Sequence, residues 1–220
     1  MVYTLTYEYH IGHHTLRMTS DWCELDEAVL YFERLMSHKG YHNIQAIDES
    51  DSVYTLKQLQ KEQESDRQSI HHLTLYFDAS FDQQSKLSGL GVVLTYDVGD
   101  KKISQRKNLD TASAKTVNEA EYYSLFHGLE QLKQLDFPPQ SIEIYGDSLV
   151  VINQLKGEWP VFDETLAKWA DDVEALLKSL NLIPVFHHID RQDNKQADRL
   201  ASQALAGTLV DATRDIEGDE

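Results

Sequence analysis

Four acidic residues stand at positions where a folded chain could gather their carboxylates. Asp78 ends a strand-like run of residues, and Asp147 follows a second such run. Glu121 lies in the first turns of one helix-like segment, and Asp198 lies in another. Strand ends and first helical turns can meet at one edge of a sheet. The sequence therefore predicts that these four carboxylates converge.

Carboxylates held this close together need a cation between them. Like charges raise each other's pKa unless a positive charge intervenes. Mg²⁺ prefers oxygen ligands and keeps water molecules that exchange with substrate phosphates. Two such ions about 4 Å apart can activate a water on one side of a phosphodiester and stabilise the leaving oxygen on the other. We therefore expect a phosphodiesterase site that holds two Mg²⁺ or Mn²⁺ ions.

Helical spacing supports part of this site. Asp198 shares a helix face with Ala201 on the border of an apolar stripe, which aims its carboxylate at the sheet. A capping-box pattern that begins at Asp193 predicts where this helix starts. The spacing does not separate Glu121 from Glu119, because both flank the apolar stripe of their helix.

Length and composition limit the classes of protein to which the chain can belong. A chain of 220 residues with 41% hydrophobic content can form one medium domain or two small ones, each with a core. Its single cysteine, Cys23, excludes an internal disulfide and suits a reducing compartment. The chain start shows no secretory leader, and no apolar run reaches the roughly 20 residues of a membrane helix. We expect a cytoplasmic protein with no membrane association.

A net charge of −17 sets the chain apart from general nucleic-acid-binding proteins. Such proteins are basic, because neutralising phosphates supplies most of their non-specific affinity. This chain should repel a polyanion at long range. A role in nucleic-acid chemistry would therefore depend on a local, metal-centred site, and high affinity is not expected.

The chain divides near residue 70 into segments of different character. Residues 1–70 are expected to form a small α+β domain with a polar connector at its end, and Gly12 marks the turn of its first hairpin. Residues 71–206 contain three hairpin-linked strands and then alternating helices and strands. This order indicates an α/β fold with a mixed sheet flanked by helices. Residues 207–220 are polar and acidic and are expected to be a disordered tail.

Four motifs in a fixed order resemble a known family. They are FDAS, TVNEAEYYSLFHGL, YGDSLVVINQL and HIDRQDNKQADRLA, within residues 73–206. Together they are similar to the type 1 ribonuclease H domain, in the compact archaeal and bacterial form described as reverse-transcriptase-like. The resemblance implies a ribonuclease H-like fold with a five-stranded mixed sheet. It also implies endonucleolytic cleavage of the RNA strand of RNA–DNA hybrids, leaving 3′-hydroxyl and 5′-phosphate ends.

The resemblance assigns roles to individual positions. The implied metal-binding, catalytic carboxylates are Asp78, Glu121, Asp147 and Asp198. It thus selects Glu121 over Glu119. His188, ten residues before Asp198, matches a histidine that assists proton transfer or product release. The implied substrate contacts are Ala79, Ser80, Asn118 and Ser148.

The chain departs from the family pattern where substrate would be held. Ala79 stands where the family often has glycine, Val117 where it often has asparagine, and Leu149 where a polar residue is common. A segment with an excess of acidic residues, 156–172, stands where longer relatives have a basic protrusion. These departures predict a weak nuclease with a strong demand for metal, or a domain whose substrate arrives by another route.

Three functions remain open. The first is a ribonuclease acting on RNA–DNA hybrids. The second is a non-catalytic or weakly active module that engages a protein partner through residues 1–70; residues 1–72 carry twelve acidic and six basic side chains and cannot supply a basic surface. The third is a nuclease for double-stranded or structured RNA. The first is favoured, because a binding module has no physical reason to keep four carboxylates together.

Overall fold

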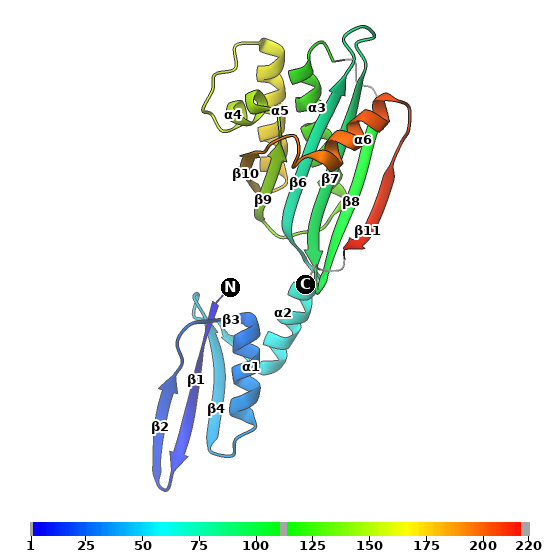
Figure 1. Ribbon diagram of the computed structural model, residues 1–220. Helices are drawn as coiled ribbons and strands as arrows, with labels where there is room; N and C mark the ends of the chain where they lie inside the picture. The colour runs from blue at the N-terminus through cyan, green and yellow to red at the C-terminus, as the bar shows by residue number, and fades with distance from the viewer. Residues whose placement is uncertain (1, 111–113, 217–220) are drawn as a thin grey trace. The chain divides into compact units, whose positions relative to one another are not determined.

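The computed structural model describes residues 2–110 and 114–216, which fall into two compact units (Figure 1). The units are Met1–Gln68 and Ser69–Glu220, so the division lies two residues before the expected position near residue 70. Each unit has its own sheet and its own hydrophobic core. None of the helices within the described ranges is long and apolar enough to cross a lipid bilayer.

The first unit is the expected α+β structure. Its strands follow the order β2-β1-β4-β5, with β3 paired to β1, and α1 packs on both the sheet and α2. Gly12 supplies the positive φ of 58° at the β1–β2 turn. The elements are β1 (Val2–Ile11), β2 (His14–Thr19), β3 (Cys23–Glu24), α1 (Leu25–Met36), β4 (Tyr41–Asp48), β5 (Val53–Tyr54) and α2 (Leu56–Gln68).

Helix α2 occupies the segment where a polar connector was expected. Most of its side chains are polar and exposed. Leu59 is nevertheless fully buried, and Leu56 packs against the same core. Because tertiary packing of one apolar face stabilises a helix in water, these two leucines help to hold α2 in place, together with hydrogen bonds between its polar side chains and those of β1 and α1.

The second unit contains a six-stranded mixed sheet in the order β10-β9-β6-β7-β8-β11. Strands β6, β9 and β10 are parallel, and the remaining pairs are antiparallel. The mixed α/β sheet was predicted correctly, with one strand more than expected. Its elements are β6 (Ile70–Phe81), β7 (Ser88–Val98), β8 (Lys101–Asp110), α3 (Val117–Gln131), η1 (Leu132–Gln134), β9 (Gln140–Gly146), α4 (Leu149–Leu155), α5 (Glu164–Ser179), β10 (Leu182–His188), α6 (Lys195–Leu205) and β11 (Asp211–Ile216).

Helices cover both faces of this sheet (Figure 1). On one face Leu75 and Phe77 of β6 pack against Leu125 of α3 in the main core. On the other face α6 rests directly on the backbone of β7. A Cβ atom added at Gly91 would stand 2.1 Å from the carbonyl oxygen of Ala197, so only glycine permits this approach.

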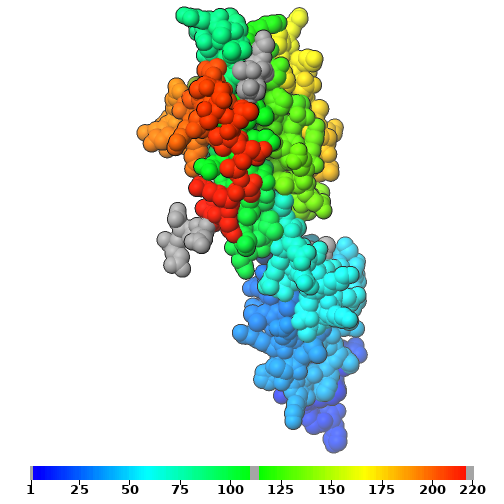
Figure 2. Space-filling model, turned by 90° about the vertical axis from the view of Figure 1, so that its right-hand side faces the viewer, coloured from blue at the N-terminus to red at the C-terminus, as the bar shows by residue number. Residues whose placement is uncertain are grey.

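The C-terminal segment forms a strand, which corrects the expectation of a disordered tail. Strand β11 pairs with β8 and lies beside α6 on one face of the unit (Figure 2). Lys101 and Lys107 of β8 form ion pairs of 3.1 Å with Asp215 and Asp211. The acidic residues that indicated disorder are therefore partners of these lysines. Residues 217–220 of the expected tail lie outside the described part of the chain.

Candidate active site

Three of the four predicted carboxylates meet in the second unit. Asp78 of β6, Glu121 of α3 and Asp147, just after β9, each offer an oxygen, and these oxygens lie within 4.8 Å of one another. Asp78 and Glu121 are 4% and 5% exposed, and Asp147 is half-buried. Within residues 2–110 and 114–216 this is the one group of three possible ligand residues. We call it the carboxylate cluster.

Strand pairing explains how Asp78 and Asp147 come together. The parallel strands β6 and β9 are paired as far as Tyr76 and Tyr145. Asp78 and Asp147 each lie two residues beyond this last pair. Two residues in a strand return to the same face of a sheet, so both carboxylates stand where the two strands separate. Glu121 reaches this point from α3.

Helix capping explains why Glu121, and not Glu119, belongs to the cluster. Thr116 caps α3 by accepting a hydrogen bond from the Glu119 amide. The Glu119 carboxylate in turn accepts a 2.6 Å bond from the amide of Lys115, which turns it away from the cluster. The backbone amide of Ala79 faces the Glu121 carboxylate and opposes part of the rise in its pKa. The Glu121 Oε2 is buried without a hydrogen-bond partner.

The cluster is electrostatically strained without a cation. Burial, followed by the charge of Asp147, raises the pKa of Asp78 to about 8. Burial, followed by the charges of Asp78 and Asp147, raises the pKa of Glu121 well above its ordinary value. Three oxygen donors and the unpartnered Glu121 Oε2 fit a hard divalent cation such as Mg²⁺ or Mn²⁺, which would remove this repulsion.

Asp198 lies beside the cluster and is paired with Arg191. Two guanidinium nitrogens of Arg191, Nε and one terminal nitrogen, donate to Oδ1 of Asp198 at 3.1 and 2.5 Å. The charge of Asp198 contributes to the raised pKa of Asp78, although it is not among the three convergent groups. Both bonds from Arg191 end on Oδ1, which leaves Oδ2 available to a cation. Sequence reasoning missed Arg191, although it lies in the HIDRQDNKQAD motif, seven residues before Asp198.

The start of α6 differs from the expected capping box at Asp193. Asn194 is the residue that precedes the helix, and no side chain caps it there. Asn194 Nδ2 instead donates a 2.9 Å bond to the carbonyl oxygen of Phe77, the residue before Asp78. This bond ties the first turn of α6 to β6 and so helps to position Asp198.

His188 lies at the sheet edge, and among the described residues its side chain forms no hydrogen bond or ion pair with the carboxylates of the cluster. It is the exposed last residue of β10, and its backbone pairs with Gly146, directly before Asp147. The preceding residue, His187, points to the opposite face of the sheet, as expected for neighbours in a strand. His187 pairs with Glu143 and stacks on the ring of Tyr145. The catalytic role of His188 stays a prediction.

The predicted substrate contacts have varied surroundings. The Ser80 hydroxyl hydrogen-bonds the Ser202 hydroxyl of α6 at 3.1 Å. The Ser148 hydroxyl caps α4 by accepting from the amide of Val151. Asn118 is half-buried in the first turn of α3. Two of these polar groups thus already serve the fold, and the substrate-binding roles stay predictions.

Comparison with known proteins covers both units. The family described as reverse transcriptase-like matches residues 76–204. The uncharacterized protein YpeP of Bacillus subtilis is 38% identical over 204 residues, covering 92% of this chain and 90% of that protein. A ribonuclease H of Clostridium botulinum is 31% identical over 140 residues, covering 56% of this chain and 86% of that enzyme.

A solved structure agrees with these sequence relationships. LC11 ribonuclease H1, crystallised in complex with an RNA/DNA hybrid, superimposes with a TM-score of 0.50 at 26% identity. The match covers 61% of this chain and 97% of that one. The family match at residues 76–204 lies within the second unit, which also holds the carboxylate cluster. The chain therefore belongs to the reverse transcriptase-like family, and its second unit is a type 1 ribonuclease H domain, the domain of ribonuclease H-type endonucleases.

Proposed function

We propose that the chain is a metal-dependent endoribonuclease that cleaves the RNA strand of RNA–DNA hybrids and leaves 3′-hydroxyl and 5′-phosphate ends. The observation that carries this proposal is the convergence of Asp78, Glu121 and Asp147, with oxygens within 4.8 Å of one another. Similarity to a ribonuclease H, and to a ribonuclease H1 crystallised with an RNA/DNA hybrid, supports the choice of substrate.

The carboxylate cluster would hold two Mg²⁺ or Mn²⁺ ions, with Asp198 as a fourth acidic ligand. Bound divalent ions supply charge stabilisation at a scissile phosphate and acidify bound water. Glu121 is buried, and its Oε2 has no hydrogen-bond partner among the described residues, so a bound cation would supply the missing interaction. Asp198 would contribute Oδ2, because Arg191 fixes the carboxylate through Oδ1.

Other residues of the chain would orient the site and move protons. Asn194 anchors the start of α6 to β6, and the close contact at Gly91 holds the helix against the sheet. We assign proton transfer to His188, because it is exposed at the end of β10 beside Gly146 and can exchange protons with solvent.

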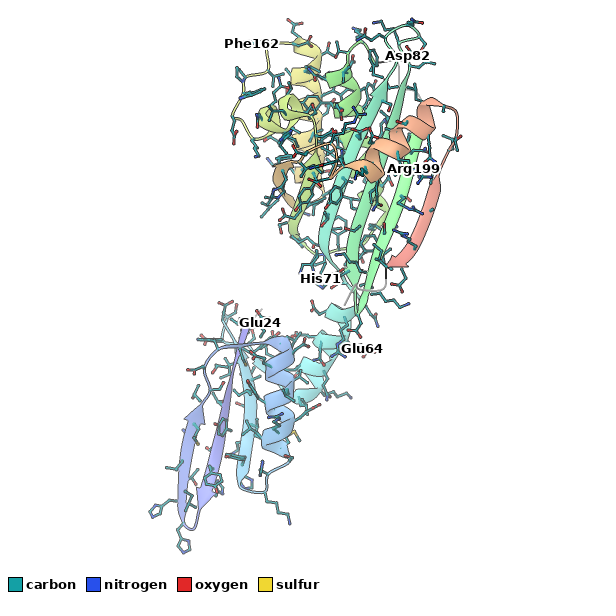
Figure 3. All side chains as sticks on the ribbon, viewed as in Figure 1. Glu24, Glu64, His71, Asp82, Phe162 and Arg199 are labelled. Carbon is teal, nitrogen blue, oxygen red and sulfur yellow. The ribbon has the colours of Figure 1, made fainter. Side chains whose placement is uncertain are left out.

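Binding of the hybrid is expected to be weak. The chain carries a net charge of −17, so bulk electrostatics oppose association with a polyanion. Exposed apolar residues, Val117 and Leu149, begin the two helices nearest the cluster. The loop between α4 and α5 carries Phe162, which is 90% exposed (Figure 3). Because salt screens the repulsion between two polyanions, cleavage should be measured over a range of salt concentrations.

The test is cleavage of a hybrid with a labelled RNA strand, with Mg²⁺ or Mn²⁺, by a matched pair of variants. Glu121→Gln should lower the rate at least about a hundredfold, because it removes a ligand whose ion is worth several kcal/mol in the transition state. Glu119→Gln should retain most activity, because the Glu119 carboxylate accepts a hydrogen bond from the amide of Lys115, just before its helix, and does not belong to the cluster. Cleavage that persists in both Glu121→Gln and Asp78→Asn would refute the assignment.

A protein-binding module is the second candidate, and one observation favours it. Strand β2 is an edge strand whose six residues are all exposed, including Leu16 and Met18. Exposed edge strands can pair with another chain. The same assay decides between the candidates, with double-stranded RNA as a parallel substrate. Absence of metal-dependent cleavage of either substrate at every salt concentration tested would favour the binding module.

A further inference from the structure

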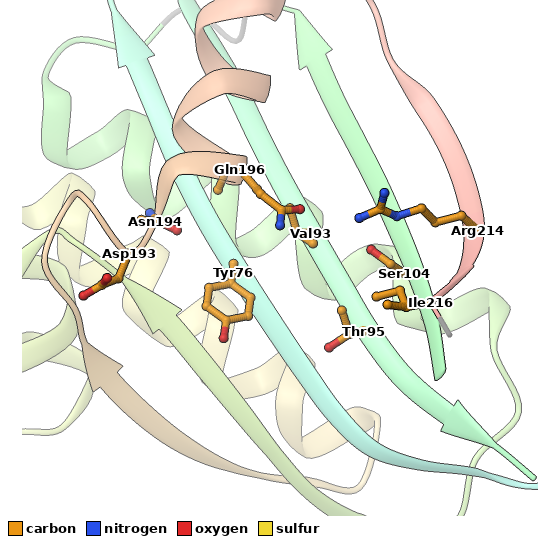
Figure 4. Close-up of a pocket in the computed structure, with 10 residues that line it drawn as sticks. Tyr76, Val93, Thr95, Ser104, Asp193, Asn194, Gln196, Arg214 and Ile216 are labelled. Carbon is orange, nitrogen blue, oxygen red and sulfur yellow. The ribbon is translucent and has the colours of Figure 1, made fainter. Parts of the chain in front are cut away.

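A cavity of about 200 Å³ lies between the start of α6, the sheet and β11 (Figure 4). Tyr76 of β6, Val93 of β7, Gln196 of α6 and Arg214 of β11 are among the residues that line it. The residues described as its lining include none of the four acidic residues assigned to metal. The cavity is therefore a separate feature of the second unit.

A row of stacked rings leads across the sheet to this cavity. His187, Tyr145 and Tyr76 are paired neighbours on three adjacent strands. Their rings stack with centroid separations of 4.6 and 4.8 Å and interplanar angles of 15° and 14°. The next residue in the row is Val93, whose short side chain ends the stack. One face of the Tyr76 ring thus lies on Tyr145, and the opposite face borders the cavity.

One arginine, Arg214, lines the far side of the cavity, and a second, Arg106, lies next to it on β8. Arg106 is the β8 partner of Val93, and Arg214 is the β11 partner of Ser104, which lines the cavity. Because side chains two residues apart share a face, Arg106 and Arg214 are diagonal neighbours on the face that α6 covers. Figure 4 shows Arg214 extending from β11 across β8 toward the cavity.

Neither of these two arginines has an acidic partner among the described residues, although the sequence contains 37 acidic residues. Arg106 Nε is buried without a hydrogen-bond partner. The two guanidinium charges repel each other, because they are like charges on diagonal neighbours. An anion bound between them would attract both.

The start of α6 forms one end of the same cavity. Asn194 is 1% exposed, and its Nδ2 is used by the carbonyl of Phe77. Its Oδ1 is buried without a partner, and Asn194 and Asp193 both line the cavity. Because Oδ1 is closed off from solvent, it offers no contact to a molecule in the cavity. The features of the cavity that could bind a ligand are therefore the free face of the Tyr76 ring and the arginine side chains.

We propose that this cavity binds a nucleoside monophosphate unit. The base stacks on the free face of Tyr76 above Val93. The phosphate lies toward Arg214 and Arg106. Tyr76 and Arg106 lie on the strands to either side of Val93, and adjacent strands are about 4.8 Å apart. The space above Val93, between these two side chains, is therefore wide enough for one planar ring. This binding does not depend on the proposed hydrolysis.

The binding test uses the full-length protein in EDTA, so that hydrolysis plays no part. Adenosine 5′-monophosphate is titrated by calorimetry and by saturation-transfer NMR of the base protons, beside adenosine and inorganic phosphate. The nucleotide should bind at least about tenfold more tightly than either fragment, because stacking and charge-assisted bonds act together. A 5′-phosphorylated trinucleotide forms a further arm: tighter binding of it identifies a strand end as the natural source, and equal binding identifies a free nucleotide.

Variants test the geometry. Arg214→Gln and Tyr76→Leu should each weaken nucleotide binding by about tenfold. Tyr76→Phe keeps the ring and should bind as the unchanged protein does. Arg199→Gln removes an exposed arginine of α6 that does not line the cavity and should have no effect (Figure 3). Equal affinity for inorganic phosphate and nucleotide, or unchanged binding by Arg214→Gln with a native NMR spectrum, would overturn the proposal.

Discussion

Replacing Asp78 by asparagine should stabilise the metal-free protein at alkaline pH. Burial, followed by the charge of Asp147, raises the pKa of Asp78 from 3.8 to about 8. Between these two values the unfolded chain has released a proton that the folded protein still binds. Folding stability is therefore lost as the pH rises from about 4 to about 8, and it stays low above that range. Asparagine has no proton to release and escapes this loss.

The pKa interval sets the size of the effect. The interval from 3.8 to about 8, at about 1.4 kcal/mol per pH unit, gives an upper limit of roughly 6 kcal/mol at pH 8. Local relaxation and water entry reduce such penalties. We therefore expect Asp78→Asn to raise the free energy of unfolding by about 2–4 kcal/mol at pH 8, and by much less at pH 5.

Urea unfolding in EDTA at several pH values between 5 and 8.5 measures this difference. Asp136→Asn, which alters an exposed carboxylate outside the carboxylate cluster, is the control. Millimolar Mg²⁺ should stabilise the unchanged protein and leave Asp78→Asn less affected, because an ion bound to the folded state shifts unfolding by mass action. If the stability difference between the two proteins does not grow from pH 5 to pH 8, the electrostatic reasoning is wrong.

Three further substitutions test how the fold supports the site. Gly91→Ala places a Cβ 2.1 Å from the Ala197 carbonyl oxygen and should lower the free energy of unfolding by about 3 kcal/mol, measured by urea unfolding. Asn108→Ala removes side-chain bonds to α6 and to the chain before β11; it should cost about 2–4 kcal/mol and speed amide hydrogen exchange in residues 210–216. Thr116→Ala removes the cap of α3 and should lower the thermal unfolding free energy by about 1 kcal/mol.

The convergence of Asp78 and Asp147 was predictable from sequence because both follow strand-like runs. The separation of β6 and β9 after Tyr76 and Tyr145 then places both carboxylates at one point. Periodicity could not select between the two glutamates of α3, since both flank its apolar stripe. The capping pattern from Thr116 to Glu119 could have done so, because a glutamate bonded to its own helix start cannot also serve the cluster.

Long-range pairing explains what the sequence did not predict. Strand β11 depends on ion pairs and backbone bonds with β8, about a hundred residues earlier, so local composition could not indicate it. The capping box at Asp193 did not form because the Asn194 side chain bonds the backbone of β6 instead. The cavity beside Tyr76 depends on the register of several strands together, and no local pattern encodes that register.

Strand β11 also has a practical consequence for anyone who shortens this protein. The similarity to the family ends at residue 204, so a fragment cut there would lack the whole of β11. The main-chain amides and carbonyls of β8 that now bond β11 would face water as an open sheet border. An unpaired edge strand can form hydrogen bonds with strands of other molecules. Such a fragment would self-associate or precipitate, and its inactivity would say nothing about the chemistry of the intact protein.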